Sequence, residues 1–188
     1  MMKGRGALIV FEGCDCSGKS SQAKKILEKM FENGFKAEII NFPDRSTDLG
    51  KFIDRYLKKE VEMEAREAHL VFSANRHAVF DKMKRKLENG VHLIVDRYAY
   101  SGIAYTMAKK TFNMDITWAK LHDSGLLKPD CVIFFDVAFR EAEKRDGFGH
   151  ERFETYEMQN KVYKTMKILQ NEEKNLWKVR NFGFTVMF

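Results

Sequence analysis

The segment that most constrains this chain is the octapeptide that follows its first apolar run. Residues 7–11 are apolar, and Gly13-Cys14-Asp15-Cys16-Ser17-Gly18-Lys19-Ser20 matches the pattern G-x-x-x-x-G-K-[ST]. Between a strand and a helix this pattern forms a phosphate-binding loop, because backbone N–H groups at the start of the helix converge on phosphate oxygens. Lys19 is then predicted to reach the terminal phosphates of a triphosphate, and Ser20 to supply an oxygen to Mg²⁺.

The rest of the chain alternates short apolar runs with longer segments of helical period, which predicts βαβ units around a parallel sheet. The expected strands are 7–11, 37–42, 91–95, 131–135 and 176–179. The expected helices are 17–31, 47–57, 64–87, 98–109, 116–122, 138–144 and 154–171. No repeat or low-complexity linker interrupts the pattern. At about 150 residues per domain, the 188 residues correspond to one domain.

Composition and charge disfavour several other classes of protein. The longest apolar runs have five residues, far fewer than the roughly 18 that span a bilayer, and the first is too short for a secretory signal. Cys14, Cys16 and Cys131 suit neither a disulfide framework nor a zinc site, so reduced thiols and a cytoplasmic location are expected. The net charge of +6 favours an anionic partner. The basic residues alternate with acidic ones, which is typical of solvated helix faces.

Two carboxylates lie where a parallel sheet would present them to a bound nucleotide. Asp96 ends the apolar run 93–95, and the carboxyl end of a parallel strand lies at the ligand-binding edge of the sheet. Asp96 is therefore predicted to act with Ser20 on Mg²⁺, and its neighbour Arg97 suits a charged ligand. Asp15 lies inside the loop itself. Either Mg²⁺ or a substrate hydroxyl would explain a carboxylate there, and so would simple solubility of the loop.

A phosphate loop identifies the donor of a phosphoryl group and not its acceptor. Arg45 follows the second expected strand, within Phe42-Pro43-Asp44-Arg45-Ser46, and should emerge at the same edge of the sheet. Phe72 and Arg76 lie four residues apart and share a helix face. An aromatic plane and a planar guanidinium can stack on and hydrogen-bond a base. The alternatives are that Phe72 is a core residue and that Arg76 belongs to an ion pair.

Taken together, these stretches resemble the thymidylate kinase family of the eukaryotic and poxviral type. The matching segments run in order from residue 5 to about residue 180. They are 5–13 with the phosphate loop, 41–47, 70–76, 95–102, 125–130 and 148–154. The resemblance implies a three-layer P-loop fold with a five-stranded parallel sheet flanked by helices. It implies a single nucleoside-monophosphate kinase domain over residues 1–188, with a short lid at approximately 144–155.

The activity that the resemblance implies is transfer of the γ-phosphoryl group of ATP, with Mg²⁺, to dTMP. The products are dTDP and ADP, on the route to dTTP. The implied ATP-binding residues are Gly13, Cys14, Asp15, Cys16, Ser17, Gly18, Lys19, Ser20 and Ser21. The implied acceptor-binding residues are Asp15, Phe42, Arg45, Phe72, Arg76, Arg97, Ser101, Gly102, Tyr105, Phe153 and Gln159. The family also commonly forms homodimers, so a homodimer is expected.

Individual roles follow from the same resemblance. Arg45 and Arg97 would hold the dTMP phosphate. Phe72 would stack on thymine and Arg76 would bond to its O4. Asp15 would bind the sugar 3′-hydroxyl, beside Tyr105, which would disfavour a 2′-hydroxyl. Two further pairs would complete the pocket, with the floor under the base formed by Ser101 and Gly102 and the lid side lined by Phe153 and Gln159.

Two features depart from the family. Cys16 stands where the family has Arg or Lys, a cation expected to stabilise the transferring phosphoryl group. Lys144, Arg145 and Arg152 around the lid are candidate substitutes, so Arg145 and Arg152 join Lys19, Asp15 and Arg97 as predicted catalytic residues. The alternative is a slow enzyme. The family also continues with a further helix beyond the last strand, so either that layer is absent here or a partner chain covers the apolar edge.

Competing functions remain at this stage. One is a pyrimidine deoxynucleoside-monophosphate kinase of relaxed specificity, since Arg76 favours a pyrimidine O4 without selecting the methyl group. Another is a catalytically weak nucleotide-binding protein, because of Cys16 and the short tail. Nucleic-acid binding is disfavoured, because the sequence lacks a clustered basic and aromatic surface.

Overall fold

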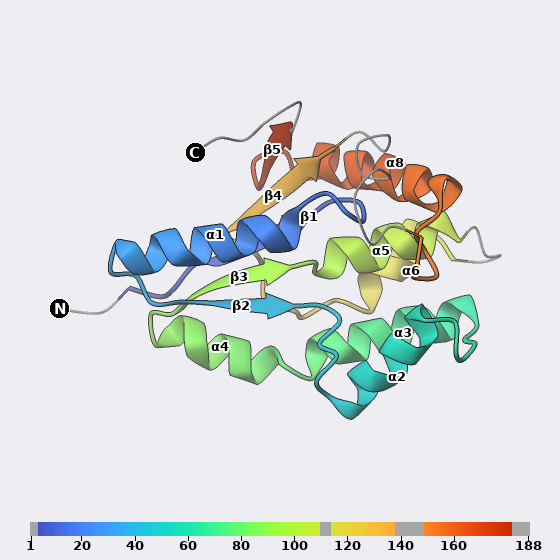
Figure 1. Ribbon diagram of the computed structural model, residues 1–188, viewed down its shortest axis with the longest axis horizontal. Helices are drawn as coiled ribbons and strands as arrows, with labels where there is room; N and C mark the ends of the chain where they lie inside the picture. The colour runs from blue at the N-terminus through green and yellow to red at the C-terminus, as the bar shows by residue number, and fades with distance from the viewer. Residues whose placement is uncertain (1–3, 110–113, 138–148, 182–188) are drawn as a thin grey trace.

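The computed structural model describes residues 4–109, 114–137 and 149–181. Its framework is one parallel sheet of five strands, in the order β2-β3-β1-β4-β5. The strands are β1 (Leu8–Glu12), β2 (Ala37–Asn41), β3 (His92–Asp96), β4 (Cys131–Asp136) and β5 (Trp177–Asn181). All five predicted strands are therefore confirmed to within two residues at each end. Because the strands are parallel, their carboxyl ends share one edge (Figure 1).

The described helices connect these strands, as parallel pairing requires. They are α1 (Lys19–Glu32), α2 (Asp48–Leu57), α3 (Ala65–His77), α4 (Phe80–Glu88), α5 (Ala99–Ala108), α6 (Ile116–Leu121) and α8 (Tyr156–Glu172). Side chains of β1 alternate between the two faces of the sheet. Phe11 packs with Ala23 of α1, whereas Leu8 and Val10 join a core that includes residues of α4, α5 and α8. The result is a helix–sheet–helix arrangement, as predicted.

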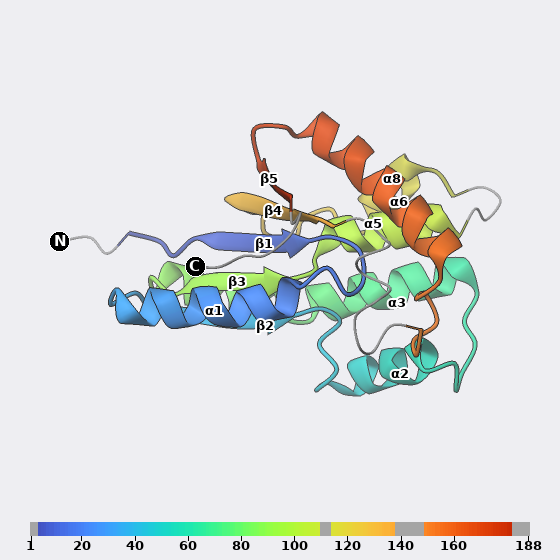
Figure 2. The ribbon, with the colours of Figure 1, turned by 45° about the horizontal axis from the view of Figure 1, so that its top comes forward.

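A second, smaller core lies beyond the carboxyl ends of the strands. It joins α2 and the start of α3 to Phe153, around Ile53, Tyr56 and Ala68. Figure 2 shows α2 and α3 at the end of the sheet toward which the strands point. This core forms one wall of the site described below.

The predicted single helix over 64–87 is wrong, because the chain forms two helices there. α3 ends at His77 and α4 begins at Phe80, with Val79 at φ −106° between them. Ala68 of α3 belongs to the smaller core, whereas Val79 and Met83 belong to the larger core that contains Leu8 and Val10 of β1. The break between α3 and α4 therefore allows the apolar residues of each helix to be buried in a different core.

Several predictions fall outside the described residues, namely the helix at 138–144, most of the lid with Lys144 and Arg145, and the tail after 181. Within the three described stretches, no helix has the length and apolar character needed to cross a bilayer.

Candidate active site

The phosphate loop lies between β1 and α1, at the centre of the carboxyl edge of the sheet. Gly13 must be glycine, because a Cβ atom there would lie 2.9 Å from the carbonyl oxygen of Phe135. Gly18 has φ +92° and contributes no capping side chain to α1. Cys16 adopts φ +55°, a left-handed conformation unusual for a residue with a side chain. The loop thus leads directly into the start of α1, where backbone N–H groups favour an anion.

Lys19 folds back over this loop. Its Nζ donates hydrogen bonds to the carbonyl oxygens of Gly13 (3.2 Å) and Cys14 (2.7 Å) and to Ser17 Oγ (3.1 Å). Burial and, to a smaller extent, the positive charge of Arg97 lower the pKa of Lys19 to about 8. Among the described residues, no carboxylate forms an ion pair with Lys19. Such a buried cation is a favourable place for a phosphate, whose charge would restore the usual pKa.

Ser20 and Asp96 come together as predicted. Ser20 is the second residue of α1 and Asp96 the last of β3, and Ser20 Oγ donates a 2.5 Å hydrogen bond to Asp96 Oδ2. A hydroxyl and a carboxylate oxygen are ligands that Mg²⁺ accepts when phosphate oxygens and water complete an octahedron. These two residues therefore fit a magnesium ion that is brought in with a nucleotide. Elsewhere in the described chain there is no group of three or more His, Cys, Asp or Glu residues that could hold a metal.

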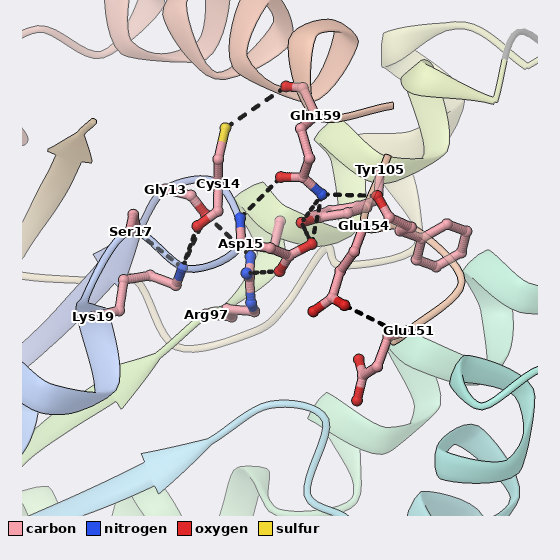
Figure 3. A network of polar contacts seen from close by, with 12 residues as sticks. Gly13, Cys14, Asp15, Ser17, Lys19, Arg97, Tyr105, Glu151, Glu154 and Gln159 are labelled. Carbon is pink, nitrogen blue, oxygen red and sulfur yellow. Dashed lines mark hydrogen bonds and ion pairs between the residues drawn. The ribbon is translucent and has the colours of Figure 1, made fainter. Parts of the chain in front are cut away.

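Asp15 lies at the centre of a polar network (Figure 3). Its Oδ1 pairs with Arg97 Nη2, and its Oδ2 accepts hydrogen bonds from Tyr105 OH (2.8 Å) and Gln159 Nε2 (2.5 Å). Gln159 Oε1 accepts from the backbone N–H of Asp15 at 2.8 Å. Asp15 is thus held by two distant parts of the chain, the segment from Arg97 to Tyr105 and Gln159 of α8. Gln159 is 1% exposed and not a solvated helix residue.

Glu12 supports this network, and the sequence analysis did not single it out. Its carboxylate accepts hydrogen bonds from the backbone N–H groups of Tyr98 (2.9 Å) and Ser101 (3.1 Å) and from Ser101 Oγ (2.6 Å). It therefore caps the start of α5, whose N-cap residue Tyr98 provides no side-chain cap. Burial raises the pKa of Glu12, an effect that Ser101 and the charge of Arg97 partly offset. The sequence feature that could have drawn attention to Glu12 is its position as an acidic residue directly after a fully apolar run.

Arg97, next to that cap, has φ +67°. Its Nη1 donates hydrogen bonds to the carbonyl oxygen of Gly13 (3.1 Å) and to Ser101 Oγ (3.2 Å). The guanidinium therefore bridges the phosphate loop and α5.

A cavity of about 650 Å³ opens beside the loop and contains most of the predicted residues. On the acceptor side it is lined by Phe42, Arg45, Phe72, Arg76, Ser101, Gly102, Tyr105 and Phe153. On the donor side it is lined by residues 15–21 and Asp96. Gly13 and Cys14 of the loop do not line it, and neither does Gln159, which supports the loop through its contacts with Cys14 and Asp15. His69, Thr106 and Lys109 also line the cavity, and sequence reasoning missed them because they carry no local motif.

Arg76 forms an ion pair, which was one of its two predicted alternatives, and it also faces the cavity. Its Nε and Nη2 donate to the two carboxylate oxygens of Asp123, at 2.9 and 2.7 Å, and both side chains are almost fully buried. Ser73 Oγ donates to the same carboxylate at 2.8 Å. Gly102 lies against the guanidinium, since a Cβ there would be 2.6 Å from Arg76 Nη2. The arginine is therefore fixed in one orientation, with Nη1 uncommitted to Asp123.

Arg45 lies on the exposed rim of the cavity. It pairs with Asp54 of α2 at 2.5 Å and with Glu151 at 2.7 Å. The turn that carries it contains a cis peptide between Phe42 and Pro43. Asn75 of α3 holds this turn, because its Oδ1 accepts from the backbone N–H of Asp44 at 2.7 Å.

Arg152 is bound to the last turn of α2 and the segment that follows it, and does not line the cavity. Its guanidinium donates to the carbonyl oxygens of Tyr56 (2.8 Å) and Val61 (3.1 Å) and forms an ion pair with Glu62 (2.7 Å). Its predicted catalytic role would require these bonds to break. Arg145, the other lid arginine, lies outside the described residues.

A phosphate loop that shares one cavity with arginines and an aromatic side chain defines a P-loop nucleoside-monophosphate kinase. The family model for thymidylate kinase matches residues 11–181 of this chain. Human thymidylate kinase is 45% identical over 175 residues, 93% of this chain and 82% of the human protein. A putative thymidylate kinase of invertebrate iridescent virus 6 is 42% identical over 164 residues, 87% of this chain and 76% of the viral one.

Solved structures agree with the sequence comparisons. The thymidylate kinase of Candida albicans superposes with a TM-score of 0.88 at 38% identity, covering 97% of this chain and 86% of that one. The chain belongs to the thymidylate kinase family.

Proposed function

We propose that this chain transfers the γ-phosphoryl group of ATP to dTMP, producing dTDP and ADP for dTTP synthesis. The observation that carries this proposal is the single cavity with the phosphate loop on one side and Phe72, Arg76 and Arg97 on the other. Phosphoryl transfer needs alignment of two phosphates and neutralisation of their charge, and little covalent chemistry from the protein.

On the donor side, residues 13–21 would enclose the phosphates of ATP. Lys19 would exchange its bonds to the loop carbonyls and Ser17 for phosphate oxygens. Because the protein has already desolvated the Lys19 ammonium, this exchange regains favourable electrostatic energy. Ser20 and Asp96 would hold Mg²⁺. Bound there, the ion would neutralise charge on the phosphate oxygens.

On the acceptor side, Arg45 and Arg97 would bind the dTMP phosphate. Phe72 would stack on thymine, and Arg76, fixed by Asp123, would donate to O4. Asp15 would accept a hydrogen bond from the 3′-hydroxyl, and Tyr105 beside it would leave little room for a 2′-hydroxyl. The acceptor phosphate is already anionic, so no strong base is required. We propose Phe42, Ser101, Gly102, Phe153 and Gln159 as the remaining walls and supports of this pocket.

We also propose that residues 144–155 form a lid. The support is the ion pair between Glu151 and Arg45, which joins the described end of this segment to the acceptor rim. Arg145 or Arg152 would then supply the cation that Cys16 does not. Arg152 would have to leave Glu62 and the carbonyl oxygens of Tyr56 and Val61. The ion pair adds little to that cost, because the Glu62 side chain is 77% exposed.

The experiment that tests the function is a coupled assay of ADP release with dTMP, dUMP, dCMP and dGMP. We expect turnover with dTMP and a loss of kcat of at least about a hundredfold in Lys19→Ala. Lys24→Ala is the matched control, since Lys24 lies on the exposed side of the same helix. A folded Lys19→Ala variant with full activity would contradict the assignment. Calorimetric titrations with ATP and with dTMP that show no heat of binding would contradict binding.

Relaxed specificity is the second candidate. The observation that favours it is the similarity to the Candida albicans enzyme, which is described as having broad substrate specificity. Comparable kcat/KM values for dTMP and dUMP would support it, and a preference of more than about a hundredfold for dTMP would not.

We further propose a homodimer that works in the cytoplasm. Leu70 of α3 and Leu121 of α6 are 44% and 66% exposed. These two helices are neighbours, since Ser73 Oγ of α3 lies 2.7 Å from the carbonyl oxygen of His122, the C-cap residue of α6. Sedimentation of wild type and Leu121→Glu tests the dimer. A reducing compartment suits the three cysteines, which form no disulfide with one another.

A further inference from the structure

Lys109 lines the same cavity as the phosphate loop, and the proposed reaction does not use it. It is the C-cap residue of α5, four residues after Tyr105. Residues four apart share a helix face. The Lys109 side chain is therefore directed to the part of the cavity beyond the Asp15 network.

The surroundings of the Lys109 amine are aromatic. Its Nζ lies 4.9 Å from the ring centroid of Phe153 and 5.6 Å from that of Tyr56. Among the described residues, its nearest hydrogen-bond contact is Tyr56 OH at 3.4 Å, longer than an ordinary hydrogen bond. In the described part of the chain, no carboxylate lies within ion-pair distance of it. Little in these surroundings favours the ammonium form over the neutral amine, apart from the two ring faces.

Electrostatics act in the same direction. Burial and, to a smaller extent, the neighbouring positive charge of Arg152 together lower the pKa of Lys109 to about 8. At pH 8, about half of such an amine is neutral. An exposed lysine with a pKa of about 10.4 has a neutral fraction about a hundredfold smaller.

Lys19 has a similarly lowered pKa but a different environment. Its Nζ donates three hydrogen bonds within the phosphate loop. Those bonds hold the ammonium in place and would all be broken if the nitrogen attacked an electrophile. Of these two cavity lysines, Lys109 is the one whose lone pair is accessible.

We propose that Lys109 is a covalent modification site for aldehydes that enter the acceptor cavity, in particular aldehydes that carry a phosphate monoester. The neutral amine adds to the carbonyl carbon to give a carbinolamine. Loss of water then gives an imine, so one amine and one aldehyde yield one imine and one water, with no oxidant or reductant. The adduct is reversible and blocks the acceptor site.

The preference for a phosphate monoester rests on the proposed function, since Arg45 and Arg97 are there assigned to the phosphate of dTMP. The amine chemistry does not depend on that assignment. The two can therefore fail separately.

The test is to incubate the full chain with pyridoxal 5′-phosphate at pH 8, reduce with borohydride and map the labelled peptides by mass spectrometry. We expect about one label per chain, on Lys109, forming about a hundredfold faster than on exposed lysines. Saturating dTMP should prevent it. Lys109→Arg keeps the positive charge but cannot form the imine, and should lose the label. Lys51→Arg, at an exposed lysine, should keep it.

Label spread over surface lysines at similar rates, or found on Lys19 in place of Lys109, would overturn the proposal. So would an unchanged label in Lys109→Arg. Label on Lys109 that forms equally fast with pyridoxal, which lacks the phosphate, would overturn the preference for a monoester. Turnover of dTMP by the same unlabelled preparation is measured in parallel. Absence of dTMP turnover in that preparation would count against the proposed function and not against the reactivity of the Lys109 amine.

Discussion

Gly102→Ala tests how the base-binding arginine is held, because two effects of opposite sign meet at this residue. Gly102 lies inside α5, where alanine is favoured over glycine by about 1 kcal/mol in helix propensity. The added Cβ would lie 2.6 Å from Arg76 Nη2 and 3.0 Å from both Cζ and Nη1. Arg76 cannot swing aside freely, since two of its nitrogens donate to Asp123 in a pair that is almost fully buried.

The magnitudes favour the clash. Forcing one extra methyl group into a packed site costs about 1–3 kcal/mol, and separating a buried ion pair costs about 3–5 kcal/mol. After subtraction of the propensity gain of about 1 kcal/mol, we expect Gly102→Ala to lower the free energy of unfolding by up to about 2 kcal/mol if Arg76 stays paired with Asp123. If the pair separates, the loss should be about 2–4 kcal/mol. Displacement of the guanidinium should also remove a charge-assisted bond to the base. That loss should raise the KM for dTMP about tenfold to a hundredfold.

Denaturant unfolding and steady-state kinetics measure the two effects. The control is the same substitution in an Arg76→Ala/Asp123→Asn background, where the clash is gone and no buried charge is left unpaired. There Gly102→Ala should raise stability by about 1 kcal/mol. If Gly102→Ala stabilises the otherwise unaltered chain and leaves the KM unchanged, the argument that Asp123 fixes Arg76 against α5 is refuted.

Three further predictions concern other parts of the site. Glu12→Ala should cost about 2–6 kcal/mol of unfolding free energy, because it strands the backbone N–H groups of Tyr98 and Ser101. Glu12→Gln, which keeps an acceptor, should cost less than half as much in the same denaturant titration, and equal losses would argue against a capping role. Cys16→Arg should raise kcat about tenfold or more by restoring a cation near the transferring phosphoryl group; no gain, with Arg152→Ala severely impaired, would assign that role to the lid. Because the pKa of Lys109 is lowered in the folded chain, the unfolded chain binds more protons than the folded chain between about pH 8 and pH 10.4. The free energy of unfolding of wild type should therefore rise relative to that of Lys109→Met as the pH rises through that window. Parallel stability curves from thermal melts would show that Lys109 is not desolvated.

The donor side of the site could be predicted from the sequence because its chemistry requires fixed spacing. Lys19 and Ser20 reach phosphate and metal only from the start of a helix that follows a glycine turn. Asp96 could be placed beside Ser20 because parallel strands end at one edge, and the 2.5 Å contact agrees. Local pattern and sheet geometry were sufficient for these residues.

The acceptor side depends on contacts between residues far apart in the chain. From the sequence, Arg76 could contact either a base or an ion-pair partner. The structure shows an ion pair with Asp123, 47 residues away, and the Arg76 side chain also faces the cavity. Lys109 had no local signal for its role, and Glu12 had only its position directly after an apolar run, which does not show what the carboxylate bonds to. The break between α3 and α4 carried no Gly or Pro, and helical periodicity continues through it.

The sequence by itself determined the phosphate loop, the five parallel strands and the edge of the sheet that carries the site, because periodicity and motif spacing are properties of neighbouring residues. The tertiary structure alone decided which buried charges meet and which side chains enclose the acceptor cavity. It also decided that the helix predicted over residues 64–87 breaks into two helices that pack into different cores. Burial and ion pairing depend on what packs against a residue, and that partner is set by the fold and not by the residue's own neighbours in the chain.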